Sequence, residues 1–164
     1  MGAISLLLRL ELLGINVGDR WETLASYLLP RLHEHALPFQ DLHYIYALAS
    51  AGKRMLAQEM LESMEDYANN IKPTLSRAWT EIALPAAKGA IAHANGDWKT
   101  TEKLFKPILP NLYKIGGSHA QRDLFQKIYA DACQKGLERT TPIYSFTKRQ
   151  SQVIHSYPKA IALS

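Results

Sequence analysis

The chain has 164 residues, of which 47% are hydrophobic and 21% are charged. This is the composition of a folded globular domain and not of a disordered or low-complexity segment. The single cysteine excludes an internal disulfide framework. No apolar run approaches the roughly 20 residues of a membrane-spanning helix. We therefore expect a cytoplasmic protein that makes no contact with a membrane.

The formal net charge of +4 is concentrated at one end of the sequence. Residues 137–164 contain four basic residues and one acidic residue, so this segment carries +3 and the rest of the chain only +1. Proteins that bind nucleic acid usually carry a basic stripe across the fold. The charge pattern therefore disfavours nucleic acid as a partner.

Helical periodicity runs through almost the whole chain, because apolar residues recur three and four positions apart. Glycine and proline residues divide it into segments, and strand-like alternation bounded by hairpin signals is missing. Pro85 is expected to kink or split one of these helices. The pattern predicts helices at residues 4–13, from 19 to about 29, at 40–50, 53–67, 76–94, 97–115 and 118–136, and a last one from 141 to about 156.

These helices are expected to pair, since a glycine precedes a new helix at residues 52, 96 and 136, with Gly18 as a fourth case. The spacings are 34, 44 and 40 residues, and a tetratricopeptide unit has roughly 34. Gly89 lies seven residues before Gly96, where a missing side chain would let the paired helix approach closely. We predict an all-α fold of stacked antiparallel helix pairs, a tetratricopeptide-like right-handed superhelix. It would occupy residues 1–136 and be followed by a basic tail at 137–164.

Three stretches of sequence are more specific than the repeat pattern. They read LLLRLELLG at residues 6–14 with VGDRWE at 17–22, PFQDLH at 38–43, and IGGSHAQRDLF at 115–125. Together they resemble the tetratricopeptide repeat protein 38 family, over about Ser5 to Gly136. The resemblance implies a helical-repeat fold without an established catalytic activity, and a chain that corresponds to the C-terminal portion of longer proteins. The tail after Gly136 departs from the family pattern.

The strongest candidate for a ligand site lies in the last of these stretches. His119, Arg122 and Asp123 are spaced three and four apart, so a helix would present them on one face. Asp123 could orient the imidazole, and Arg122 could hold a carboxylate or phosphate near the helix start. The simpler interpretation is a helix capped by Ser118 whose first turn bonds to the preceding helix pair.

Histidines elsewhere give weaker signals. His43 could join the same site, although it is more typical of a residue that packs against the helix of Trp21 or bonds to a loop carbonyl. His33 and His35 are two residues apart and would point to different faces of a helix, whereas zinc-protease histidines are four apart. Phosphate-loop, dinucleotide and nucleophile-elbow motifs are also missing. We predict neither a metal site nor a cofactor.

The favoured function is that of a non-catalytic interaction domain that binds a peptide, a protein or its own copy. The alternative is a small-ligand site or an enzyme centred on His119, Arg122 and Asp123. The first helix, residues 4–13, is apolar nearly all round, and the resemblance implies that its usual preceding helices are missing. We therefore predict a homodimer with this helix in its interface, unless the tail folds back over it.

Overall fold

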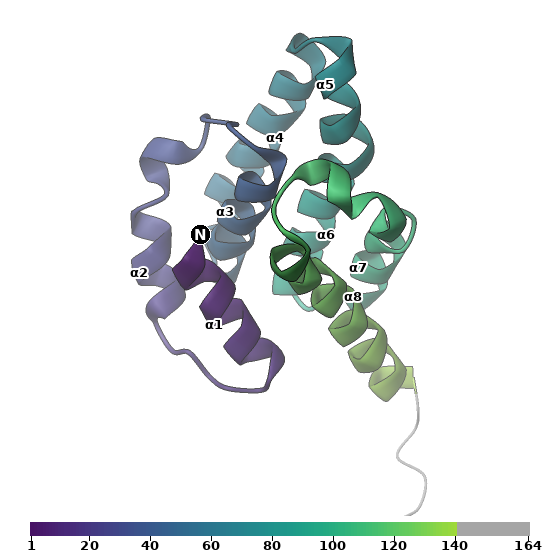
Figure 1. Ribbon diagram of the computed structural model, residues 1–164. Coiled ribbons are helices and arrows are strands. Elements are labelled where there is room, and N and C mark those ends of the chain that lie inside the picture. Colours follow the sequence, from purple (N-terminus) through teal and green to yellow (C-terminus); the bar gives the residue numbers. More distant parts are fainter. Residues whose placement is uncertain (141–164) are drawn as a thin grey trace, which may run out of the picture.

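The computed structural model describes residues 1–140, and every regular element of this part of the chain is helical (Figure 1). The predicted all-α class is thus confirmed. The last predicted helix, after Thr141, lies outside the described residues. The α-helices are α1 (Gly2–Leu12), α2 (Arg20–Ser26), α3 (Pro38–Ser50), α4 (Arg54–Asn70), α5 (Pro73–Ala78), α6 (Leu84–Ala94), α7 (Trp98–Phe105) and α8 (His119–Thr140). Shorter turns are η1 (Leu29–Arg31), η2 (Trp79–Ala83) and η3 (Leu109–Ile115).

Helix α3 forms the centre of the molecule and contacts α1, α2, α4 and α6. It is apolar on nearly every side, and Leu42, Ile45 and Leu48 are fully buried, as expected of a helix that is surrounded by others. Helix α6 in turn packs against α3, α4, α7 and α8. The pairs α3/α4 and α6/α7 are thus joined through α3 and α6.

The close approach of α6 and α7 confirms the role expected of Gly89. A Cβ atom at this position would lie 2.8 Å from the ring of Phe105, nearer than real Cβ contacts come. Phe105 is fully buried against the gap that the glycine leaves. The sequence therefore fixes this helix contact through one small residue and one large one.

The segment predicted as one kinked helix over residues 76–94 begins earlier, at Pro73, and contains a π-helical turn. This turn, η2, ends two residues before Pro85. Proline has no N–H to donate and its ring crowds the preceding turn, so a wider turn accommodates it without ending the helix. The predicted kink therefore takes the form of a π turn.

Helix α8 passes through Gly136, so the helix end predicted there is wrong, and the helix crosses the predicted boundary at residue 137. Unlike the turn glycines Gly52 and Gly96, Gly136 does not have a positive φ. Its Cα faces the Cβ of Trp98, 3.9 Å from where a side chain would begin. Gly136 is therefore an interior residue of α8 that lies against Trp98, and it does not end the helix.

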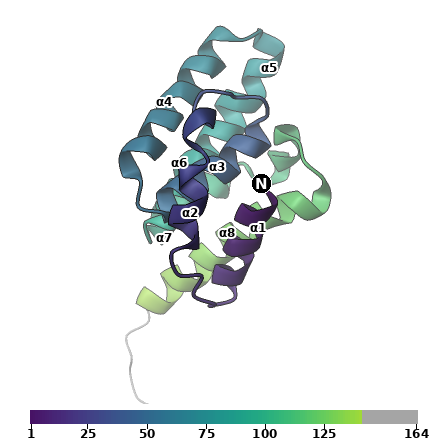
Figure 2. The same ribbon diagram turned by 90° about the vertical axis from the view of Figure 1, so that its left-hand side faces the viewer.

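Helix α1 is covered on one side by the same chain. Ile4, Leu7 and Leu8 are buried, and the helix contacts α2, α3 and α8 (Figure 2). Leu6 and Leu13 remain 57% and 77% exposed. Helix α8 therefore takes part of the apolar surface that we expected a second subunit to cover. Within residues 1–140, no helix has the length and apolarity needed to cross a bilayer.

Candidate functional site

The predicted cap of the last described helix is present. Ser118 Oγ accepts the backbone N–H of Gln121 at 3.3 Å, and Gln121 Oε1 accepts the N–H of Ser118 at 2.8 Å. This reciprocal pair is a capping box. It satisfies amide donors at the start of α8 and fixes the direction in which the following residues point.

Two of the three predicted ligand residues after this cap, Arg122 and Asp123, make contacts within the fold. The guanidinium of Arg122 donates to the carbonyls of Gly116 and Gly117. The carboxylate of Asp123 pairs with Lys127 and with Arg9, and these two cations lower the pKa of Asp123, Lys127 more strongly. The contacts of Arg122 and Asp123 therefore support the structural interpretation of this segment.

His119 is exposed at the first position of α8. His43 is instead 3% exposed, and its Nδ1–H donates to the carbonyl of Phe39 at 2.8 Å. Its ring lies between Phe39 and Phe125, at centroid distances of 4.6 and 5.4 Å. Burial lowers the pKa of His43, which keeps the imidazole neutral. Of the two histidines of the predicted site, His119 is thus exposed to solvent, whereas His43 lies in an apolar environment.

The three stretches that carry the family resemblance come together in space. Arg9 of the first donates to the carbonyl of Ala120 at 3.0 Å and pairs with Asp123. Phe39 of the second packs so closely on Gly117 that a Cβ there would lie 2.9 Å from its ring. These residues therefore form one packed junction between α1, α3 and α8.

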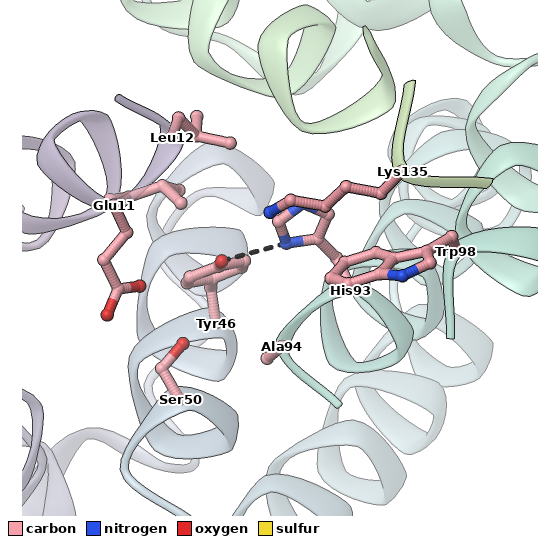
Figure 3. Close-up of a pocket in the computed structure, with 9 residues that line it drawn as sticks. Glu11, Leu12, Tyr46, Ser50, His93, Ala94, Trp98 and Lys135 are labelled. Atoms are coloured by element: carbon pink, nitrogen blue, oxygen red, sulfur yellow. Dashed lines mark hydrogen bonds between the residues drawn. The ribbon is translucent and has the colours of Figure 1, made fainter. Parts of the chain in front are cut away.

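A pocket of about 270 Å³ lies beside this junction, where five helices meet (Figure 3). One wall comes from α1, the floor from α3, and the opposite wall from α6, α7 and α8. It combines apolar and polar side chains, as ligand sites generally do. The lining residues are Leu8, Glu11, Leu12, Tyr46, Ser50, His93, Ala94, Trp98 and Lys135.

A chain of hydrogen bonds crosses the pocket. The hydroxyl of Tyr46 lies 3.0 Å from Nδ1 of His93, and Nε2 of His93 lies 2.9 Å from Oδ2 of Asp131. Lys135 pairs with the same oxygen at 2.8 Å, and its Nζ stands 4.8 Å from the centre of the Trp98 ring. The lysine is therefore held between a carboxylate and an aromatic face.

The charge states along this chain follow from burial. Burial lowers the pKa of His93, against the opposing effect of Asp131. Burial also raises the pKa of Tyr46, and the nearby charge of Glu11 adds to this effect. The tyrosine thus keeps its proton and donates to Nδ1, and a neutral His93 donates its Nε2–H to Asp131. Both hydrogen bonds of His93 are therefore made with the tyrosine and the imidazole uncharged.

The opposite wall carries negative charge. Glu11 Oε1 accepts the indole N–H of Trp21 at 2.8 Å, which holds the carboxylate at the edge of the pocket. Figure 3 shows Glu11 and Leu12 on one side of Tyr46, with Trp98 and Lys135 on the other. The pocket therefore presents an acceptor and a donor across an aromatic floor.

No family model matches the chain, and no solved structure matches it. Function must therefore be inferred from the geometry of the chain itself. The sequence patterns did not single out His93. The partners of His93 are 47 and 38 positions away, so no local spacing connects them. Only the i, i+4 pair Asp131–Lys135 could have been noticed on its helix.

Proposed function

We propose that this chain is a non-catalytic helical-repeat interaction domain that binds a peptide segment at the five-helix pocket. The observation that carries the proposal is the pocket itself, with one acceptor and one donor on opposite walls. Its volume of about 270 Å³ is just below the range of roughly 300–1,000 Å³ typical of drug-sized ligands. It suits one anchoring side chain of a longer segment.

The pocket walls match the chemistry of a peptide. Glu11 can accept a backbone N–H, and Lys135 can donate to a carbonyl, while Leu8, Leu12 and Trp98 contact an apolar side chain. Beside the pocket, a second hollow of about 340 Å³ runs between α1 and α8 and shares Leu12 with it. An extended segment could follow both, because the two sites share that wall.

Two further features support the wider assignment. The α3/α4 and α6/α7 pairs stack through α3 and α6, which fits the proposed tetratricopeptide-like right-handed superhelix. The proposed relationship to the tetratricopeptide repeat protein 38 family rests on the three stretches that meet at the α1–α3–α8 junction. A cytoplasmic location and a protein or peptide partner belong to the same proposal. We do not propose a ligand site at His119, Arg122 and Asp123, since Arg122 and Asp123 bond within the fold.

The experiment begins with peptides selected from a random displayed library against the wild-type chain. Their affinity is then measured for Ser50→Leu, which adds volume inside the pocket, and for Ser26→Leu, which makes the same change on the exposed side of α2. We expect Ser50→Leu to weaken binding by at least about tenfold, or about 1.4 kcal/mol. Ser26→Leu should bind as the wild type does.

Thermal melting of both variants shows whether the fold is retained. Equal affinities of a folded Ser50→Leu and Ser26→Leu for every selected peptide would contradict binding at this pocket. The same holds if selection repeatedly yields no binder, because a peptide-binding pocket should enrich anchored sequences.

A second candidate is binding to a copy of the same chain through α1. The specific observation is an exposed apolar stripe formed by Leu6 of α1 and Leu13, which directly follows the helix, with Leu10 half-buried between them. Side chains of this kind, gathered on one face, are typical of an interface. This contact would leave the five-helix pocket in each subunit.

A further inference from the structure

A second chain of polar contacts, away from the pocket, ties the turn after η1 to helix α4. Asp41 Oδ2 lies 2.6 Å from His35 Nδ1, and His35 Nε2 lies 2.7 Å from Ser63 Oγ. Ser63 Oγ also lies 2.8 Å from His33 Nδ1, and His33 Nε2 lies 3.2 Å from Glu59 Oε1. Four contacts thus lead without a break from a buried carboxylate to an exposed one.

The local backbone makes this arrangement possible and differs from the expectation for a helix. His33 and His35 lie in a turn, so their rings do not point apart but converge on Ser63. His35 has φ of 43°, and it is the non-glycine residue with positive φ in the part of the chain that the structure describes. Such a conformation costs on the order of 1–3 kcal/mol and persists where surrounding contacts hold it. The contacts of His35 with Asp41 and Ser63 stabilise this conformation.

Counting hydrogens shows what the chain of contacts requires. Each of the four contacts needs one hydrogen between its two heavy atoms. Two neutral imidazoles carry one N–H each and the serine carries one O–H, while ionised carboxylates carry none. Three hydrogens cannot fill four contacts. All four contacts have a hydrogen only when the five side chains hold one additional proton, on an imidazole or on a carboxylate.

We propose that these five residues form a binding site for a single proton, which latches the segment from His33 to the first turn of α3 onto α4. With the proton bound, every contact closes. Without it, the contact between His33 and Glu59, which we call the outer arm, opens. These side chains are 61% and 50% exposed, so water can replace their contact. The inner pair stays closed, since His35 and Asp41 are 3% and 2% exposed and a neutral His35 still donates to the carboxylate.

The surroundings of the inner pair favour a retained proton. Burial raises the pKa of Asp41 against the opposing effect of His35, and the charge of Glu34 raises it further. Glu34 itself pairs with Arg31 at 3.0 Å. From the other side, the rings of Tyr67 and Trp79 pack on His35 at centroid distances of 5.2 and 5.9 Å. The two carboxylates at the ends of this series of contacts, those of Asp41 and Glu59, favour a proton between them.

The order Asp41, His35, Ser63 is also that of a catalytic serine triad. A catalytic serine additionally needs donors that stabilise the oxyanion. The backbone N–H groups around Ser63 lie in the middle of α4 and are used within that helix. The hydroxyl of Ser63 also contacts a second imidazole, that of His33. The geometry is that of a bridging oxygen between two imidazoles.

The segment that carries His35 forms one wall of a third hollow. A groove of about 600 Å³ lies between the turn, α5 and η3. Ala36, Leu37 and Pro38 of the latched turn line it, together with Tyr67 and Trp79, the two rings that pack on His35. The proton site therefore borders this groove through His35, and the groove shares no lining residue with the five-helix pocket.

Urea unfolding of the wild type and of Ser63→Ala, measured from about pH 8.5 to about pH 6, tests the proposal across the range in which imidazoles change charge. Where the folded wild type binds a proton that the unfolded chain has released, its advantage over Ser63→Ala grows as the pH falls. The ratio of the two unfolding constants should change by up to about tenfold per pH unit. Ser26→Ala, which removes an exposed hydroxyl that bonds within its own turn, should give a constant ratio.

His33→Ala separates the outer arm from the rest and should remain folded, because this side chain is mostly exposed. It should remove the pH dependence as fully as Ser63→Ala does, and the fluorescence of Trp79 should follow the same pH profile in the wild type alone. A ratio of unfolding constants for wild type and Ser63→Ala that stays constant with pH would overturn the proposal. So would a wild-type pH profile in His33→Ala.

Discussion

At the scale of single residues, the sequence identifies side chains whose role depends on size or on near neighbours. Gly89 could be recognised because only glycine leaves room for a large residue on the paired helix, and Phe105 fills that room. Ser118 could be recognised from its place before a helical segment. His93 could not, because its hydrogen-bond partners come from α3 and α8 and only the folded chain brings them together.

Two buried histidines predict how stability depends on pH. Burial lowers the pKa of His43 and of His93 below the ordinary value of 6.5. The unfolded chain therefore binds protons that the folded chain rejects, and the free energy of unfolding contributed by these groups falls as the pH drops below about 6.5. His43→Phe, which suits a site between Phe39 and Phe125, should lose less stability on acidification than the wild type. Denaturant melts at several pH values measure this difference, and equal losses in both proteins would show that His43 does not contribute.

At the scale of elements, helix positions followed from the period of the apolar residues, but helix ends did not always follow from glycine and proline. Gly136 remains helical within α8 and lies against Trp98. Pro85 sits just after a π turn and does not break the helix. The turn of His33 and His35 was misjudged because the sequence contains no sign of the left-handed conformation at His35. A glycine or a proline therefore does not by itself mark the end of a helix.

The capping box of α8 gives a prediction at the same scale. Ser118→Ala removes the oxygen that accepts the N–H of Gln121, and it should lower the free energy of unfolding by about 1 kcal/mol. Ser26→Ala removes a hydroxyl that bonds to a carbonyl in its own turn and serves as the control. Urea unfolding at neutral pH compares the two. An unchanged stability of Ser118→Ala would mean that the cap does not hold the start of α8.

At the scale of the whole molecule, α1 packs against α2, α3 and α8, and its contact with α8 is one that the local pattern could not reveal. Ile4, Leu7 and Leu8 are buried among these helices, and Leu6 and Leu13 are left at the surface. If the chain forms the proposed homodimer, Leu6→Glu with Leu13→Glu should convert it to a monomer without loss of fold. Light scattering at micromolar concentration measures this, with Glu62→Gln on the exposed side of α4 as a control. A wild type that is already monomeric would contradict the dimer.

The proposed binding site can be tested most directly with the three tryptophans as reporters. Trp98 lines the five-helix pocket, Trp21 donates to Glu11 at its edge, and Trp79 lines the separate groove beside α5. In a ¹H–¹⁵N NMR titration with a selected peptide, the indole signals of Trp98 and Trp21 should shift while that of Trp79 stays in place. A shift of Trp79 alone would contradict the account, because it would place the peptide in the other groove.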